Sequence, residues 1–182
     1  ELPIIAEDLG VITPDVESLR DGFNLPGMKI LQFGFSSVPE DSFLPHHYPL
    51  NCFAYTGSHD NDTAQGWFDH ASPKEQRFCL DYLGATENDV PHAMIREVWR
   101  SPARYTVAPM QDFLGLGTEA RMNLPGSPSG NWSWRMSSKA LTNELRDRIY
   151  KLNYLYSRLP ETEKTLNSQK LKAEDDGSVK PH

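Results

Sequence analysis

The stretch "PIIAEDLGVITPDVESLRDGFNLPGMKILQFGF", residues 3–35, predicts a β-strand, an α-helix and a second β-strand in succession. Residues 3–6 are a short apolar run typical of a buried strand, and residues 28–35 form another. Between them, Thr13 is placed to cap a helix that is expected to end at Gly22. A strand, a helix and a strand in this order form a βαβ unit, in which the two strands run parallel.

Two further apolar runs, residues 52–56 and 105–108, continue this alternation of strands and helices. Between them, the sequence "SPKE", residues 72–75, is a capping box with proline at the first helical position. A helix is therefore expected to begin there and to end at Gly84, because glycine readily adopts the left-handed conformation that closes a helix.

Apolar residues spaced by about 3.6 positions predict amphipathic helices at residues 90–99 and 141–155. The stretch "MQDFLGLG", residues 110–117, lacks the spacing of a phosphate-binding loop and predicts a tight turn. Four strands alternating with helices predict an α/β fold, roughly the second half of a closed (β/α)8 barrel, since a whole barrel has about 250 residues. The alternative is a small open sheet, although no strand is followed by the Gly-x-Gly-x-x-Gly pattern of dinucleotide-binding sheets.

The charge and composition of the chain limit its partners. The 182 residues carry a formal net charge of −7, which argues against binding to nucleic acid or to an anionic membrane surface. No apolar run approaches the roughly 18 residues that a membrane-spanning helix needs. Cys52 and Cys79 are too few and too isolated for a disulfide framework or a zinc site. An uncharged substrate fits this composition better.

A change of composition near residue 160 predicts one folded domain followed by a tail. Residues 1–160 contain all the predicted strands and helices. Residues 161–182, "ETEKTLNSQKLKAEDDGSVKPH", have few apolar side chains and mixed charges, so they are predicted to be disordered.

Candidate catalytic residues follow two of the predicted strands. Glu7 and Asp8 come directly after the first strand, and the sequence "SHDND", residues 58–62, follows the third. In a parallel barrel, residues at the carboxyl ends of the strands form the active site. Two carboxylates that meet there suit glycoside chemistry, in which one acts as acid and base and another stabilises or traps the positively charged sugar.

Less specific interpretations of these residues remain open. Glu7 and Asp8 can belong to an ordinary turn after a strand, and residues 58–62 can form a hydrogen-bonded loop. A metal site is a further alternative, with candidate ligands His46, His47, His59, Asp60 and Asp62. Four tryptophans could stack on sugar rings or pack in the core: Trp67, Trp99, Trp132 and Trp134.

Five motifs that occur in a fixed order carry a resemblance to a known family. They are "PIIAEDLGVITPDV", "PGMKILQFGF", "YTGSHDNDT", "PMQDFLGLG" and "RMNLPGSPSGNWSWR". Together they resemble the carboxy-terminal part of the 4-α-glucanotransferases, also called amylomaltases or disproportionating enzymes, a family of the α-amylase clan. The resemblance covers about residues 1 to 160. It implies a partial TIM-type barrel that acts on α-1,4-glucans and maltooligosaccharides without a metal or an organic cofactor.

The resemblance also implies a role for individual residues. Glu7 matches the general acid/base of the family, and Asp60 matches the carboxylate that stabilises the transition state by holding sugar hydroxyls. His59 matches a ligand of the same donor sugar, and Asp8 is expected on the acceptor side. Asn123 matches a position near the substrate groove. The implied reaction is a retaining double displacement, in which a sugar acceptor takes the place of water.

The family's nucleophile has no match in this chain. Family members form a covalent intermediate on an aspartate of an earlier strand, so this chain is expected to be a fragment that is inactive by itself. The alternative is a catalytically inactive remnant that binds glucan or a protein partner. The family implies the bacterial cytoplasm or the plastid stroma as the compartment, and the residues do not indicate an oligomeric state.

Overall fold

The computed structural model describes residues 3–164 of the chain, which divides after Ala140 into two compact units. The first unit holds a parallel β-sheet and the helices that cover it, and the second holds a single long helix. Within the described residues, every helix is too short or too polar to cross a membrane.

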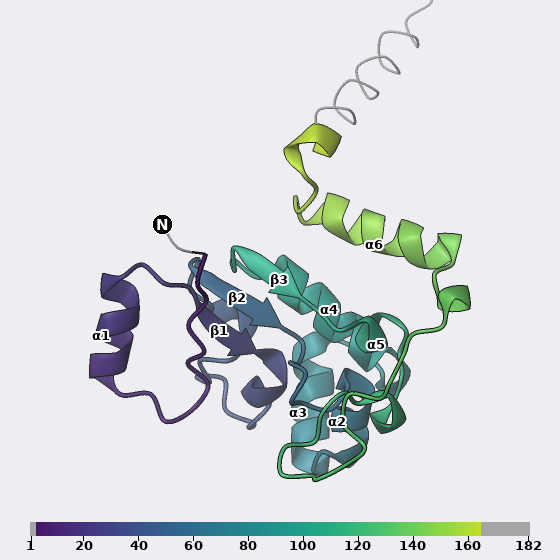
Figure 1. Ribbon diagram of the computed structural model, residues 1–182, viewed down its shortest axis with the longest axis horizontal. Helices are drawn as coiled ribbons and strands as arrows, with labels where there is room; N and C mark the ends of the chain where they lie inside the picture. Colours follow the sequence, from purple (N-terminus) through teal and green to yellow (C-terminus); the bar gives the residue numbers. More distant parts are fainter. Residues whose placement is uncertain (1–2, 165–182) are drawn as a thin grey trace, which may run out of the picture. The chain divides into compact units, whose positions relative to one another are not determined.

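Three short strands form the sheet: β1 (Gly27–Ile30), β2 (Cys52–Tyr55) and β3 (Tyr105–Val107). They are parallel and lie side by side in the order β1-β2-β3 (Figure 1). The predicted parallel α/β fold is therefore confirmed. The strand predicted at residues 28–35 is shorter than expected, because the chain turns into a 3₁₀ helix at Leu31–Gly34.

The first predicted strand, residues 3–6, is not a strand in this structure. The segment lies along β1, where the Ala6 N–H donates to the Pro26 carbonyl at 2.9 Å. Its apolar side chains are poorly covered, with Ile4 47% and Ile5 42% exposed. A β-strand requires a ladder of bonds to a neighbouring strand. This segment makes only one such bond within the described residues, so the prediction of a strand here was wrong.

The helices of the first unit include three at predicted places: α1 (Pro14–Gly22), α3 (Pro73–Leu83) and α4 (Val90–Arg100). The capping box of α3 is confirmed in both directions. The Ser72 hydroxyl accepts from the Glu75 N–H at 3.3 Å, and the Glu75 carboxylate accepts from the Ser72 N–H at 2.8 Å. Gly84 ends the helix with a φ of +57°, the left-handed conformation expected of it.

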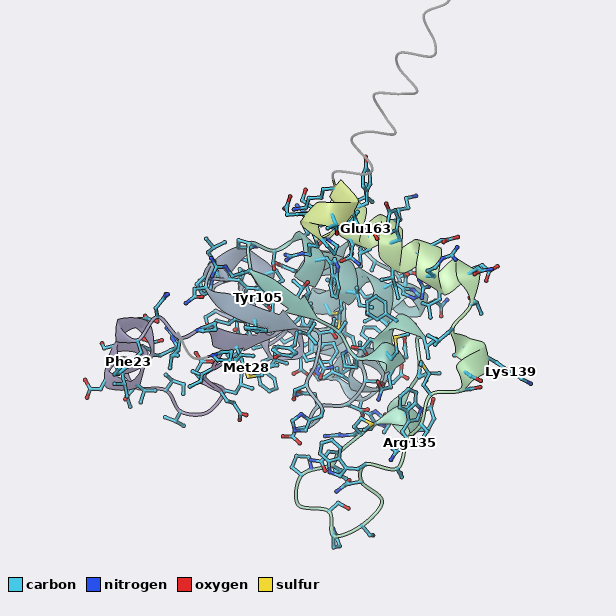
Figure 2. The ribbon with its side chains drawn as sticks, turned by 45° about the horizontal axis from the view of Figure 1, so that its top comes forward. Phe23, Met28, Tyr105, Arg135, Lys139 and Glu163 are labelled. Atoms are coloured by element: carbon cyan, nitrogen blue, oxygen red, sulfur yellow. The ribbon has the colours of Figure 1, made fainter. Side chains whose placement is uncertain are left out.

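The hydrophobic core lies between the sheet and helix α4. This helix contacts β3, α3 and two helices that the sequence did not predict, α2 (Ala64–His70) and α5 (Met110–Phe113). Figure 1 shows α2, α3 and α4 grouped beside the sheet, with α1 standing apart from them. Helix α1 buries none of its residues, and Phe23 at its end is exposed (Figure 2).

The second unit contains helix α6 (Asn143–Leu155), which agrees with the helix predicted at residues 141–155. The Thr142 hydroxyl caps it by accepting from the Leu145 N–H at 3.2 Å. Of the tail predicted at residues 161–182, the structure describes only residues 161–164, which form a helical turn. The rest of the predicted tail lies outside the described residues. The predicted domain boundary at residue 160 stays a prediction.

Candidate active site

A cleft of about 660 Å³ opens where the three strands end. Tyr55 at the end of β2 and Val107 at the end of β3 form part of its wall, as does Phe33 in the turn after β1. Glu7 and Asp60 both lie in its lining. The cleft therefore combines apolar walls with two carboxylates that come from segments far apart in the sequence.

Glu7 and Asp8 have different surroundings although they are neighbours in the chain. Successive side chains of an extended segment point to opposite sides. Glu7 lines the cleft and is exposed, whereas the side chain of Asp8 is only 6% exposed. The Asp8 carboxylate accepts from Arg20 Nη1 at 2.5 Å and from the Met28 N–H at 2.7 Å. These contacts hold Asp8 outside the lining of the cleft, and its acceptor-side role stays a prediction.

Three of the residues assigned from the resemblance lie together in the structure. Asn123 Nδ2 donates to Asp60 Oδ1 at 2.5 Å, and His59 Nε2 lies 3.4 Å from the same oxygen. The Asn123 N–H also donates to the His59 carbonyl at 3.1 Å. Within the described residues, no side chain bonds to the second carboxylate oxygen, Oδ2 of Asp60. The half-exposed carboxylate is thus held through one oxygen, which leaves the other for a ligand hydroxyl.

Arg121 joins the two loops that carry these residues, a role that the sequence did not indicate. Its Nη2 donates to the Asp60 carbonyl at 2.7 Å, and its Nε donates to the Asn123 carbonyl at 2.8 Å. Its Nη1 lies 3.9 Å from Asp62 Oδ2. Arg121 stands two positions before Asn123 in one of the recognised motifs, so its place in the sequence was the available signal.

The loop at residues 57–63 is fixed by its own hydrogen bonds, as one of the alternatives proposed. Asn61 Oδ1 accepts from both the N–H and the hydroxyl of Ser58, at 2.9 and 2.8 Å. Asp62 Oδ2 accepts from the Thr118 hydroxyl at 2.8 Å. Asn61 and Asp62 therefore support the loop, and they line the cleft together with His59 and Asp60.

The alternative metal site is not assembled. His46 Nδ1 lies 2.9 Å from the Tyr82 hydroxyl, and His47 Nε2 lies 3.0 Å from the Pro39 carbonyl. Among residues 3–164, no group of three or more histidine, cysteine, aspartate or glutamate side chains could hold a metal ion.

The tryptophans divide between the core and the surroundings of the site. Trp67 packs on Phe35 with ring centroids 5.1 Å apart, and Trp99 is buried. Trp132 is 51% exposed, and its ring centroid lies 5.2 Å from that of His59. Of these three, Trp132 is the one placed to meet a ligand beside His59.

Comparisons with known proteins find matches over most of the chain. A family model described as 4-alpha-glucanotransferase matches residues 1–142. The 4-alpha-glucanotransferase of Thermus thermophilus is 52% identical over 157 residues, which are 82% of this chain and 31% of the relative. The chloroplastic/amyloplastic 4-alpha-glucanotransferase of Arabidopsis thaliana is 44% identical over 163 residues, which are 87% of this chain and 28% of the relative.

A solved structure shares the fold of most of the chain. The amylomaltase from Streptococcus agalactiae in complex with acarbose is 34% identical, with a TM-score of 0.84 over 88% of this chain and 33% of that one. The chain thus spans about a third of the length of the relatives that it matches. Glu7, His59, Asp60 and Asn123 all lie within the residues that the family model matches.

Proposed function

The chain belongs to the 4-α-glucanotransferase family, and we propose on that basis that it supplies the acid/base side of a site that transfers segments of α-1,4-glucans. The observation that carries the proposal is the common cleft of Glu7 and Asp60. The acceptors would be glucose or maltooligosaccharides. Such substrates suit a cleft with apolar walls, because sugar rings pack against apolar surfaces while their hydroxyls bind to polar groups.

Glu7 is the proton donor and acceptor in this proposal. In the first step, protonated Glu7 gives its proton to the glycosidic oxygen while a carboxylate from outside this chain attacks the anomeric carbon. The bond to the departing sugar breaks, and a covalent glycosyl ester forms. In the second step, Glu7 takes a proton from an acceptor hydroxyl. The acceptor oxygen then attacks the anomeric carbon and releases the carboxylate.

Asp60 stabilises the transition state by accepting hydrogen bonds from hydroxyls of the donor sugar. Its Oδ1 is held by Asn123, so that Oδ2 can accept these bonds with little loss of conformational freedom. His59 lies beside Asp60 and binds the same sugar. Asn123 acts by fixing Asp60, and Asp8 reaches the acceptor only if its carboxylate leaves Arg20 and Met28.

We further propose that the sheet is part of a (β/α)8 barrel. Met28 on β1 pairs with Phe53 on β2, and Phe53 pairs with Tyr105 on β3. These three side chains therefore form a row across the face of the sheet opposite the helices. Phe53 and Tyr105 stack with centroids 4.3 Å apart, yet Tyr105 remains exposed. Layers of inward side chains of this kind fill the interior of such barrels. Further strands would cover them.

The compartment and the partners follow the same reasoning. The relatives include a bacterial and a chloroplastic enzyme, so we place this chain in the bacterial cytoplasm or in the plastid stroma. We propose α-1,4-glucans as its partners rather than nucleic acid or membrane, because its net charge is negative.

The test is the disproportionation of maltotriose. The chain is measured alone and after reconstitution with the part of the Thermus thermophilus relative that it does not match, and the products are separated by chromatography. Glucose and longer maltooligosaccharides are expected only after reconstitution. Glu7→Gln is expected to lower the rate by about 10²- to 10⁴-fold, which is the usual contribution of a general acid/base.

Glu17→Gln is the matched control, because Glu17 is an exposed glutamate on α1. It should leave the rate unchanged. A soluble reconstituted protein that forms no product, or one in which Glu7→Gln keeps the full rate, would contradict the proposal. Activity of the chain alone would instead contradict the expectation that its nucleophile lies elsewhere.

Binding without catalysis is a second candidate function. It is favoured by one observation, that this chain forms the cleft with His59 and Asp60 by itself. Calorimetric binding of maltotriose to the chain alone, combined with inactivity after reconstitution, would support this candidate over the transferase.

A further inference from the structure

Asp112, on the short helix α5, is a fully buried carboxylate that the proposed reaction does not use. Its Oδ2 accepts from the Thr56 hydroxyl at 2.5 Å, and its Oδ1 accepts from the Ala64 N–H at 2.8 Å. Thr56 follows the last residue of β2, and Ala64 is the first residue of α2. One buried carboxylate therefore binds both ends of the loop at residues 57–63.

We infer that Asp112 is a positioning residue that fixes this loop, so that Asp60 meets Asn123 and faces the donor sugar. The inference rests on the proposed function, because the loop carries His59 and Asp60. It adds a role for a residue that touches neither sugar nor reacting atoms. The loop spans only seven residues between the two points at which Asp112 holds it, which limits how far Asp60 can move.

The residue before Asp112 supports the same interpretation. Gln111 is buried, and its Nε2 donates to the Ala120 carbonyl at 3.1 Å. Ala120 directly precedes Arg121, the residue that joins Asp60 to Asn123. Neighbouring side chains of α5 thus hold the two loops that form the Asp60–Asn123 contact, one loop each.

The chemistry of the Asp112 site explains why a polar side chain is required there. Burial disfavours an ionised carboxylate and raises the pKa of Asp112, an effect that its two hydrogen bonds only partly offset. An apolar residue would avoid this cost but would leave the buried Ala64 N–H and Thr56 hydroxyl unpaired. Asparagine can keep both contacts, because its carbonyl oxygen accepts from Ala64 and its amide donates to the Thr56 oxygen.

Three variants separate positioning from simple packing. Asp112→Leu places a side chain of nearly the same shape as aspartate there and removes both hydrogen bonds. Asp112→Asn keeps both hydrogen bonds, and Thr56→Val removes the one from the Thr56 hydroxyl. Asp81→Leu, at an exposed position on α3, controls for the substitution itself. Hydrogen–deuterium exchange of the 182-residue chain measures how often the loop opens, through the exchange rates of the Ser58 and Ala64 amides.

Faster exchange of these amides is expected in Asp112→Leu and Thr56→Val, with exchange in α4 unchanged and Asp112→Asn close to the parent. In the reconstituted enzyme, Asp112→Leu should lower kcat by about 100-fold, the effect of roughly 1 Å of misplacement, with a KM within a factor of three. Asp112→Asn should restore most of the kcat.

Unchanged exchange of the loop amides in Asp112→Leu would overturn the inference, as would an equal loss of kcat in Asp112→Leu and Asp112→Asn. If Asp112→Leu does not fold, Thr56→Val decides by the same criteria. A reconstituted parent enzyme without activity would overturn the proposed function instead. The exchange measurement would still decide whether Asp112 holds the loop.

Discussion

The change of Asp8 to alanine is expected to release the segment that carries Glu7. Among the described residues, this segment is anchored by three hydrogen bonds: one from the Ala6 N–H to the Pro26 carbonyl, and two that the Asp8 carboxylate accepts from Arg20 on α1 and from the Met28 N–H on β1. The isoleucines of the segment are only partly buried, with Ile4 47% and Ile5 42% exposed. The attachment of Glu7 therefore depends largely on its neighbour.

The size of the effect follows from the contacts that are lost. A hydrogen bond to a charged group contributes about 1.5–3 kcal/mol to stability. Asp8 makes two, but the Arg20 guanidinium can turn to water and to Asp21, and the Met28 N–H is only part-buried. We therefore expect the free energy of detaching the segment to fall by about 3 kcal/mol, which corresponds to roughly a 100-fold change in the opening equilibrium.

Hydrogen–deuterium exchange at the Ala6 amide measures this opening, because the amide exchanges when its bond to Pro26 breaks. The Asp8→Ala variant should exchange Ala6 about 100-fold faster, while the amides of α4 keep their rates. Asp21→Ala is the matched control. Asp21 accepts from Nε of the same arginine at 2.8 Å but is exposed, so solvent screens the pair and little change is expected.

An Ala6 amide that exchanges at the parent rate in Asp8→Ala would contradict this prediction. It would mean that the segment is held by the backbone alone. Equally faster exchange of the Ala6 amide in Asp8→Ala and Asp21→Ala would also contradict the prediction. It would mean that any carboxylate bound to Arg20 holds the segment, and not the buried Asp8 in particular.

Three further predictions concern the folded unit as a whole. Ser72→Ala removes the capping box of α3 and should lower the free energy of unfolding in urea by about 1 kcal/mol. The raised pKa of Asp112 means that its contribution to stability is complete below the ordinary carboxyl pKa and is lost as the pH rises through the raised value. Thermal melts should therefore show that the parent loses stability relative to Asp112→Asn on going from acid to neutral pH. Burial raises the pKa of the Cys52 thiol to about 11 and that of Cys79 to about 12, so neither should react with Ellman's reagent at about pH 8 until urea unfolds the chain.

The elements that sequence analysis predicted correctly are those with strong local signals. The helix α3 begins at a capping box and ends at a glycine, and both signals act within a few residues. Helices α2 and α5 were missed because seven and four residues are too few to show a 3.6-residue period. The predicted strand at residues 3–6 failed for another reason. Strand formation depends on a paired neighbour, and no local pattern reports whether that neighbour is present.

The candidate site shows the same limit of local information. His59 and Asp60 are adjacent in the sequence, and their position after a strand predicted a place at the end of the sheet. Asn123 lies 63 positions from Asp60 in the chain, and its 2.5 Å contact with that residue arises from tertiary folding. The spacing of the residues could not predict this contact, and only the family resemblance pointed to Asn123. Arg121 and Asp112 were missed because each binds a backbone group far away in the chain, the Asp60 carbonyl and the Ala64 N–H, and such contacts leave no pattern in the sequence.

The pair of adjacent carboxylates divides two tasks between its members. An extended chain must point Glu7 and Asp8 to opposite sides, so one faces the cleft and the other faces β1. The donors available to a carboxylate decide which of the two residues faces β1. The Met28 N–H and Arg20 both donate to Asp8, so Asp8 faces β1 and Glu7 faces the cleft. Gly27 completes this fit, since a Cβ at position 27 would approach the Asp8 carboxylate more closely than real Cβ atoms do. A side chain at position 27 would thus act on Glu7 through Asp8, although Gly27 lies outside the lining of the cleft.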